Sequence, residues 1–226
     1  MKNDWKFSGD ISLEFQDHIS KSIPNYEKIQ EYVISFSEYI CFEGAKVLDI
    51  GCSTGYTLAN LENEYKNRKL KLVGCEIEKD MVKVSLDRVK DKGIEIKNED
   101  FEYMNSDEKF DLLISIFTLQ FLNPPKRKRV INKIYDHCSE GGYFLFSEKV
   151  ISKDSFIENV MSSILRENKI NNGISEKDVI EKEKSLRGVM HCIKEDEIYK
   201  EMKNAGFSSV ELLIKENSFA LFIAKK

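Results

Sequence analysis

Short runs of β-branched and apolar residues alternate with longer segments of helical periodicity along most of the 226-residue chain. The runs that we expect to form the first five strands lie at residues 46–50, 70–77, 94–98, 111–117 and 143–149. Such alternation is typical of βαβ units, in which successive strands lie parallel and helices cover the sheet. The pattern therefore predicts an α/β fold with a mostly parallel sheet.

The segments between these strands carry apolar residues every three or four positions, as helices do. One such stripe precedes the first strand: Ile29, Val33, Phe36 and Ile40. It predicts a helix from about residue 26 to residue 40. A later helix is expected to begin at Pro125, where a missing N–H costs nothing, and to end at Gly141-Gly142, since glycine often stops a helix.

Two β-rich runs, residues 210–215 and 219–224, follow the last helical segment, and only Glu216-Asn217-Ser218 separates them. A connection this short allows a hairpin but not a crossover, so the last strand must enter antiparallel. With the five earlier strands, this predicts a Rossmann-like, seven-stranded, mostly parallel sheet with an antiparallel last strand and helices on both faces. We expect one domain over residues 1–226, with an N-terminal arm and helix in residues 1–40.

Residues 152–191 depart from the alternation, because they are highly charged and helical in pattern without an intervening strand. One helical stripe of apolar residues lies in their first half: Phe156, Val160 and Ile164. Asn171-Asn172-Gly173 predicts a break, and Ser175 with Asp178 resembles the capping box that starts a second helix. An insertion at the carboxyl edge of a parallel sheet is placed to cover a ligand crevice, so we expect a helical cover.

The composition, with 41% hydrophobic and 33% charged residues, is that of a globular protein. The start of the chain lacks the apolar run of a signal peptide, and the longest apolar-rich stretch, residues 111–122, is too short for a membrane span. We therefore expect a cytoplasmic protein without a membrane partner. The net charge of −4 gives no broad attraction to a phosphate backbone, which favours a small-molecule substrate over direct nucleic-acid binding.

Two local features bear on other partners. The five cysteines include no CxxC pair, so we expect neither a disulfide framework nor a metal site, but reduced and mostly buried thiols. The basic run Lys126-Arg127-Lys128-Arg129 has two interpretations, a phosphate or partner site and a solvated first turn of a helix. Its place at the start of an amphipathic helix favours the solvated turn.

A hydrophobic strand that ends in Asp49 leads into a turn of small residues, Gly51-Cys52-Ser53-Thr54-Gly55. The two glycines let a ligand approach the backbone closely, and free N–H groups at the start of the next helix favour an anion. A dinucleotide fingerprint would place glycines where this chain has Ser53 and Tyr56. The turn therefore indicates a cofactor with a carboxylate, such as S-adenosylmethionine, and argues against NAD.

Acidic residues close the next two predicted strands. Glu76 lies 25 residues after Gly51 and could accept hydrogen bonds from both ribose hydroxyls of a nucleoside. Asp100-Phe101 would offer a carboxylate to the adenine amino group and an aromatic face to its ring. Each is an ordinary residue alone, but together with the Asp49 turn they predict a nucleoside site.

At this point the chain resembles the class I methyltransferases, and within them the carboxy-S-adenosylmethionine synthases of the tRNA wobble-uridine pathway. The resemblance covers nearly the whole chain and is carried by Trp5-x-Phe7, Ile23-Pro24-Asn25-Tyr26, Asp49-x-Gly51-Cys52-Ser53-x-Gly55, Phe117-Thr118-Leu119-Gln120-Phe121-Leu122, Gly141-Gly142 and Ser147-Glu148-Lys149. It implies a homodimer and cofactor contacts from Tyr26, Gly51, Cys52, Ser53, Glu76, Ile77, Asp100, Phe101 and Ile116, beside Asp49 and Gly55 of the turn.

Two departures from that family bear on the reaction. Ile116 stands where the family has Asn, and Lys182-Glu183 stands where the family has Lys followed by the Arg that pairs with the extra carboxylate of its product. A glutamate repels a carboxylate, although Arg187 or a lysine nearby could replace the missing Arg. We therefore expect methyl transfer to a small molecule; carboxy-S-adenosylmethionine synthesis from prephenate and a non-catalytic, cofactor-binding regulatory role are the alternatives.

Methyl transfer from a sulfonium requires in-line geometry and a dry pocket, and a base only where the acceptor carries a proton. His191, at the end of the predicted cover, is the first candidate for such a base. His18, in the N-terminal arm, is the second. For both, a structural role is the competing interpretation.

Overall fold

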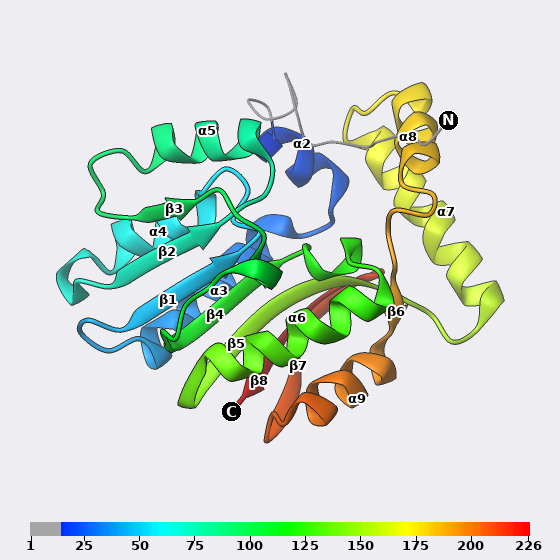
Figure 1. The fold of residues 1–226 in the computed structure, drawn as a ribbon. Coiled ribbons are helices and arrows are strands. Elements are labelled where there is room, and N and C mark those ends of the chain that lie inside the picture. The colour runs from blue at the N-terminus through cyan, green and yellow to red at the C-terminus, as the bar shows by residue number, and fades with distance from the viewer. Residues whose placement is uncertain (1–14) are drawn as a thin grey trace.

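The computed structural model describes residues 15–226, so the Trp5-x-Phe7 segment lies outside the described residues. A twisted sheet forms the centre of the molecule, with helices on both faces and a helical cover beyond one end (Figure 1). The strands are β1 (Lys46–Ile50), β2 (Lys71–Cys75), β3 (Glu95–Lys97), β4 (Phe110–Ile116), β5 (Cys138–Ile151), β6 (Ile193–Lys194), β7 (Ser209–Glu216) and β8 (Phe219–Lys225).

The strand order β3-β2-β1-β4-β5-β8-β7 confirms the predicted Rossmann-like topology. The neighbours from β3 to β5 pair in parallel, whereas β8 pairs antiparallel with both β5 and β7. The antiparallel last strand follows from the short turn before it. The pattern did not predict β6, which has only two residues and pairs with the end of β5.

The helices are α2 (Phe15–Ser22), α3 (Tyr26–Ile40), α4 (Tyr56–Glu64), α5 (Lys79–Arg88), α6 (Pro124–His137), α7 (Ser155–Asn171), α8 (Glu176–Ser185) and α9 (Glu195–Ala205), with short 3-10 turns η1 (Lys66–Arg68), η2 (Phe101–Tyr103) and η3 (Leu119–Phe121). Among these elements, no helix is both long and apolar enough to cross a membrane. All five cysteines are free thiols, and four of them are buried.

Both faces of the central strands β1, β4 and β8 are buried, which explains why these strands are mostly apolar. Successive residues of β1 belong to different cores: Val47 packs with apolar residues of α3 and α4, and Leu48 packs with those of α6 and α9. Because side chains alternate along a strand, this pattern places helices on both sides, as predicted.

The helix that was expected to end at Gly141-Gly142 ends instead at His137, and β5 begins at Cys138. The glycines lie within β5, where its pairing with β4 shifts register. A Cβ on Gly142 would lie 2.9 Å from Cys138 Sγ, so the glycine serves a close backbone approach at this irregularity. The helix begins at Pro124 rather than Pro125. The side-chain oxygen of Asn123 caps it by accepting a hydrogen bond from Lys126 N–H at 3.0 Å.

The prediction that residues 126–129 form a solvated turn is wrong for Arg127. The Arg127 side chain is only 2% exposed and donates two hydrogen bonds of 2.6 Å to the fully buried Glu148 carboxylate. Its Nε donates to Glu201 at 2.8 Å, so this residue ties α6 to β5 and α9. Arg129 pairs with Glu102 at 2.5 Å. The run follows a partly buried helix face, which local periodicity alone did not resolve.

The predicted cover is formed by α7 and α8, which lie beyond the carboxyl ends of the strands (Figure 1). The break falls where it was expected, since α7 ends at Asn171 and Ser175 caps α8 by accepting from Asp178 N–H at 3.1 Å. The stripe of Phe156, Val160 and Ile164 is exposed, with 74% of Phe156 accessible. The stripe therefore predicted the helix correctly, but its side chains belong to neither hydrophobic core formed by residues 15–226.

Candidate functional site

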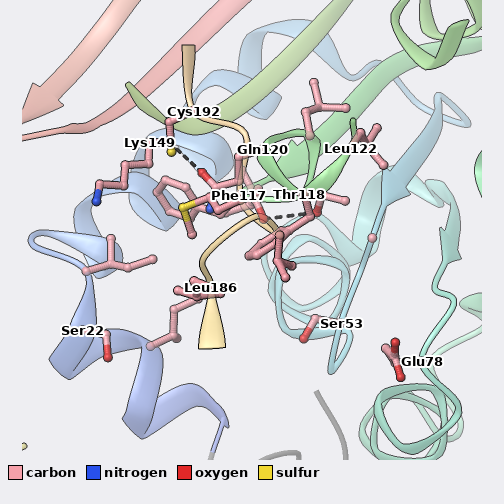
Figure 2. Close-up of a pocket in the computed structure, with 18 of the residues that line it drawn as sticks. Ser22, Ser53, Glu78, Phe117, Thr118, Gln120, Leu122, Lys149, Leu186 and Cys192 are labelled. Atoms are coloured by element: carbon pink, nitrogen blue, oxygen red, sulfur yellow. Dashed lines mark hydrogen bonds between the residues drawn. The ribbon is translucent and has the colours of Figure 1, made fainter. Parts of the chain in front are cut away.

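A cavity of about 830 Å³ lies between the carboxyl ends of β1, β2 and β4 and the helical cover (Figure 2). In the sheet, β2 lies on one side of β1 and β4 lies on the other, so the strand order reverses its direction at β1. Such a switch point is where open α/β sheets place their ligands. The walls come from α2, from the loops after β1, β2 and β4, and from α7 and α8.

The turn after β1 brings backbone to the cavity wall. Gly51 has φ +73°, and a Cβ there would lie 2.4 Å from Thr118 Oγ1 of the loop after β4. Ser53 also has a positive φ of 50°. Glycine is thus required at position 51 both by the backbone conformation and by the close approach of two loops that line the same cavity.

Glu76 is held firmly beside this turn at the end of β2. One carboxylate oxygen accepts from Ser53 N–H at 2.9 Å, and the other accepts from the N–H groups of Ile77 at 2.8 Å and Glu78 at 2.9 Å. Burial raises the pKa of Glu76, and the backbone donors oppose that rise. The result is an acceptor fixed on the cavity wall, with lone pairs remaining for a diol.

Asp49 lies behind that wall and is fully enclosed in the sheet. Burial, assisted by the nearby Glu76 carboxylate, raises the pKa of Asp49 to about 8. Asp49 stands at the end of β1, two residues before Gly51 of the turn that lines the cavity.

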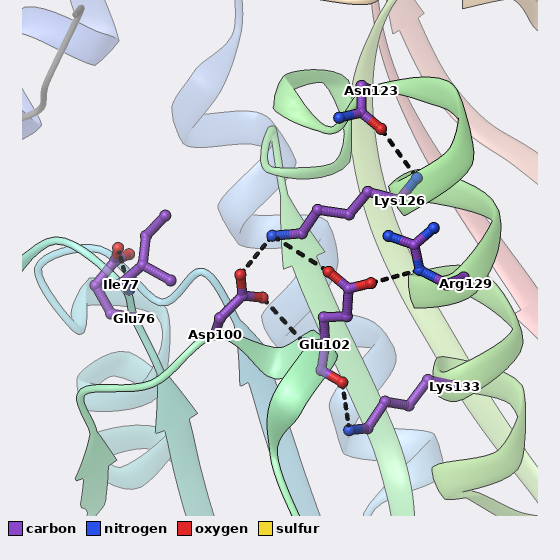
Figure 3. Close-up of polar contacts among 8 residues, drawn as sticks. All are labelled: Glu76, Ile77, Asp100, Glu102, Asn123, Lys126, Arg129 and Lys133. Carbon is purple, nitrogen blue, oxygen red and sulfur yellow. Dashed lines mark hydrogen bonds and ion pairs between the residues drawn. The ribbon is translucent and has the colours of Figure 1, made fainter.

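Asp100 and Phe101 occupy a third part of the wall. Asp100 caps η2 by accepting from Glu102 N–H at 3.0 Å, and its other oxygen pairs with Lys126 of α6 (Figure 3). Lys126 also lies 3.7 Å from Glu102, so the acid and the lysine position each other. Phe101, 4% exposed, presents an aromatic surface beside them.

The opposite end of the cavity carries cations. Lys169 of α7 and Lys182 of α8 both line it and are half-buried. Burial and the charge of Lys169 lower the pKa of Lys182 to about 7, and burial with the charge of Lys149 lowers the pKa of Lys169. Glu183, also on this wall, pairs with Arg166 at 2.7 Å rather than with Arg187.

The structure brings together most of the residues that the sequence singled out. Those on the cavity wall are His18, Gly51, Ser53, Glu76, Ile77, Asp100, Phe101 and Ile116. Those outside the lining are Tyr26, Asp49, Cys52, Gly55 and His191. Tyr26 is enclosed, its hydroxyl accepts from Gln30 at 3.0 Å, and burial raises its pKa to about 12. Their individual roles remain predictions.

The two candidate bases differ in position. Desolvation, then the charges of Lys182 and Lys169, lowers the pKa of His18 on the cavity wall. The backbone N–H of His191 donates to Gln120 O at 2.6 Å, and its neighbours Met190 and Cys192 line the cavity. The geometry thus places His18, the second candidate base, on the cavity wall, and His191, the first candidate, just outside it.

Sequence reasoning did not assign a role to Gln120 or to Lys169 of the cover. Gln120 is buried, and its side-chain oxygen accepts from Lys149 N–H at 2.7 Å (Figure 2). With its bond to His191, it joins the loop after β4 to β5 and to the end of the cover. The sequence signal that could have indicated a role for Gln120 was its place in the Phe-Thr-Leu-Gln-Phe-Leu run at residues 117–122.

Comparison with known proteins agrees with this geometry. Residues 47–142 match a family model described as a methyltransferase domain. The chain is 33% identical over its full length to a carboxy-S-adenosyl-L-methionine synthase of Campylobacter hominis, and 31% identical to one of Nautilia profundicola, covering 96% of each relative.

Solved structures show the same fold at low identity. A phosphoethanolamine N-methyltransferase 2 of Haemonchus contortus in complex with S-adenosyl-L-methionine superposes with a TM-score of 0.69 at 13% identity, over 99% of this chain and 58% of that chain. An S-adenosylmethionine-dependent methyltransferase of Clostridium acetobutylicum gives a TM-score of 0.65 at 14% identity, over 94% and 96%. This chain thus spans less than two thirds of the first of these structures and nearly all of the second.

Proposed function

The chain belongs to the carboxy-S-adenosyl-L-methionine synthase family, and from this premise we propose that it is an enzyme that transfers the methyl group of S-adenosylmethionine to a small-molecule acceptor. Its domain and fold are those of S-adenosylmethionine-dependent methyltransferases. The observation that carries the proposal is one cavity whose lining includes the Gly51 turn, Glu76 and the helical cover.

The described residues fit this cofactor. Glu76 would accept hydrogen bonds from the ribose hydroxyls, because its carboxylate is fixed at the wall by three backbone donors. Phe101 would pack against adenine beside Asp100, and the Gly51–Ser53 turn would approach the methionine moiety. The cofactor supplies a methyl group already activated by a sulfonium, so the protein needs to orient the acceptor and exclude water.

His18 is the histidine that the geometry favours as a proton acceptor. Its lowered pKa means that the imidazole is neutral at pH 7, so it can take the proton that an acceptor loses. His191 would act instead through the position of the cover, since its backbone is bonded to Gln120. Both assignments are proposals for mutagenesis.

Carboxy-S-adenosylmethionine synthesis is the second candidate, and the names of the 31–33% identical relatives favour it. Two observations oppose it. Glu183 stands on the wall where the resemblance expects an Arg, and the nearby Arg166 guanidinium is engaged by Glu183 at 2.7 Å. The product's carboxylate would therefore find no free guanidinium at position 183 or 166, and Arg187, which also lines the cavity, is the one that would have to replace it.

Product analysis separates the two reactions. The protein is incubated with S-adenosylmethionine and prephenate, and the cofactor products are weighed by mass spectrometry, for wild type and for Glu183→Arg. We expect little or no carboxylated cofactor from wild type, because position 183 carries a negative charge where the family resemblance places an Arg. If wild type formed the carboxylated product at the rate of a synthase assayed in parallel, methyl transfer would be the wrong function and carboxy-S-adenosylmethionine synthesis the right one.

We also propose that the protein is cytoplasmic, that it forms a homodimer and that it does not bind nucleic acid directly. Five free thiols are typical of a reducing compartment, and the net charge of −4 disfavours a phosphate backbone. The exposed apolar stripe on α7 supports association of two copies. Sedimentation velocity would reveal the oligomeric state.

A non-catalytic, regulatory role is the remaining alternative. It would require that the protein binds the cofactor but has no site for an acceptor.

A further inference from the structure

The cavity wall divides along the order of the strands. The proposed contacts to methionine, ribose and adenine follow β1, β2 and β3, so the cofactor would occupy that half of the site. The next strands in the sheet, β4 and β5, bring Gln120 and Lys149 to the same cavity. Figure 2 shows Glu78 and Lys149 on opposite sides of the cavity, with Gln120 toward the side of Lys149. This half of the wall is left for the acceptor.

The side-chain amide of Gln120 has a fixed orientation. Its oxygen, Oε1, accepts from the backbone N–H of Lys149 at 2.7 Å. Because a backbone N–H can face only the oxygen of an amide, this contact settles which end of the side chain is which. Nε2, with its two N–H donors, is therefore directed away from Lys149.

Nothing in the described part of the chain accepts from Nε2. Within residues 15–226, the bond to Lys149 is the one hydrogen bond of the Gln120 side chain. Nε2 is also not among the sealed side-chain atoms that lack a partner in this range. Since Gln120 lines the cavity, its two free donors are open to whatever the cavity holds.

The surroundings of this amide are apolar. Gln120 is only 3% exposed, and Phe117, Phe219 and Met190 line the cavity with it. Buried polar groups are nearly always hydrogen-bonded, because a donor removed from water without an acceptor destabilises the fold. Two free donors on an apolar wall thus indicate a ligand that supplies an acceptor atom. A neutral amide suits a carbonyl or a carboxylate oxygen.

The loop that presents Gln120 is strained and firmly held. Phe117 has a φ of 57°, a left-handed conformation that a bulky residue keeps only where its surroundings enforce it, as they often do at ligand sites. Its N–H donates to Ser147 O at 2.9 Å, and its ring packs edge-on against Phe219 at 5.6 Å. The backbone oxygen of Gln120 accepts from His191 N–H at 2.6 Å. The donors are therefore held in place before a ligand binds.

We propose that Gln120 binds the methyl acceptor directly, by donating from Nε2 to a carbonyl or carboxylate oxygen of that molecule. This assignment rests on the proposed function and deepens it, since it gives the acceptor's chemical class: a small molecule with such an oxygen on an apolar body. Gln120 thereby determines specificity, because an analogue without the oxygen leaves the buried donors unpaired.

The experiment titrates the full chain, saturated with S-adenosylhomocysteine, with three probes of similar shape, and follows binding by ligand-observed NMR. Acetophenone offers a ketone, benzoate offers a carboxylate, and α-methylstyrene carries a methylene group in place of the ketone oxygen. We expect acetophenone or benzoate to bind at least about tenfold more tightly than α-methylstyrene, because only they pair the donors of Gln120. The tighter of the two identifies the acceptor's oxygen as a carbonyl or a carboxylate.

Two variants separate a binding role of Gln120 from a structural one. Gln120→Glu keeps the shape of the side chain and an oxygen for the N–H of Lys149, but it replaces the free donors by an oxygen. Gln120→Met keeps the length and removes both functions. We expect the preference for the oxygen-bearing probe to disappear in both variants. Binding of S-adenosylhomocysteine, titrated first by calorimetry, should stay unchanged, which also shows that each variant is folded.

Asn123 provides the matched control. Its side-chain oxygen likewise accepts from a backbone N–H, that of Lys126 at 3.0 Å, but the residue is exposed. Asn123→Asp therefore makes the same chemical change on the same loop, keeps the bond to the backbone and removes no buried donor. This variant should retain the preference for the oxygen-bearing probe.

The outcomes separate this proposal from the proposed function. If S-adenosylhomocysteine does not bind wild type, the proposed function fails, and the role of Gln120 fails with it. If it binds but neither acetophenone nor benzoate is preferred over α-methylstyrene, the role of Gln120 alone is overturned.

The variants can overturn the role of Gln120 in three further ways. A preference kept in Gln120→Glu would mean that only the bond to Lys149 matters. A preference kept in Gln120→Met would mean that the loss in Gln120→Glu comes from its charge. Loss of S-adenosylhomocysteine binding in either variant would assign Gln120 to the cofactor or to the fold instead of the acceptor.

Discussion

Gly51 shows how a single residue positions two loops of the site. Its φ of +73° and the 2.4 Å approach of Thr118 Oγ1 to an added Cβ leave no room for a side chain. We predict that Gly51→Ala destabilises the fold by more than the roughly 1 kcal/mol that a left-handed alanine costs, and that it abolishes binding of S-adenosylhomocysteine. Urea unfolding and calorimetry measure the two effects.

Gly93 offers a matched control for this substitution. It has a similar φ of +68°, but nothing lies within 4 Å of an added Cβ. Gly93→Ala should therefore show the backbone cost alone and retain cofactor binding. Equal destabilisation by the two substitutions would contradict the idea that the turn and the loop after β4 are fitted to each other.

At the scale of elements, Arg127 joins α6 to β5 and α9 through Glu148 and Glu201. We predict that Arg127→Met destabilises the protein by about 3–5 kcal/mol, because it leaves the Glu148 carboxylate buried without a partner. Removing both charges in Arg127→Met/Glu148→Leu should recover most of that loss. The free energies come from urea unfolding.

Arg129→Met is the control, because Arg129 is 59% exposed where it pairs with Glu102. Glu102 is only 10% exposed, but it keeps Lys126 as a second cation at 3.7 Å, so we expect a loss of less than about 1 kcal/mol from the exposed Arg129 end. If the double substitution were as unstable as Arg127→Met, the loss would come from packing and not from the unpaired carboxylate.

The cover is the element whose stability we expect to depend on ligand. Each of its helices buries only one residue, Leu165 in α7 and Val179 in α8. Few buried contacts imply local opening at low free energy. We predict that amides of residues 155–185 exchange with deuterium faster than those of β1 and β4, and slow down when cofactor and acceptor bind. Equal protection of cover and sheet without ligand would exclude a gating role.

At the scale of the whole molecule, the sequence predicted what local periodicity and turn chemistry determine. The parallel strands, the helix at residues 26–40 and the antiparallel last strand each depend on neighbouring residues, and each was confirmed. The placement of Gly51, Glu76 and Phe101 around one cavity followed because the carboxyl ends of parallel strands converge.

Contacts between residues distant in the sequence were not predictable in this way. Arg127 finds Glu201 across 74 positions, and nothing in the basic run distinguished it from its neighbours. Glu183 pairs with Arg166 on another helix, a contact that no spacing in the sequence indicated. Both pairings are set by how the helices pack, which single-sequence patterns do not contain.

The central claim is that the part of the cavity lined by Glu76, Asp100 and Phe101 holds the nucleoside of S-adenosylmethionine, and titration calorimetry tests it most directly. The account predicts that S-adenosylmethionine and S-adenosylhomocysteine bind with micromolar affinity and that NAD does not. Glu76→Gln should weaken S-adenosylhomocysteine about tenfold or more, because a charge-assisted hydrogen bond contributes roughly 1.5–3 kcal/mol. Glu64→Gln, an exposed glutamate on α4, should leave it unchanged. Affinity within about twofold of wild type in Glu76→Gln would contradict the ribose assignment and, with it, the orientation of the whole site.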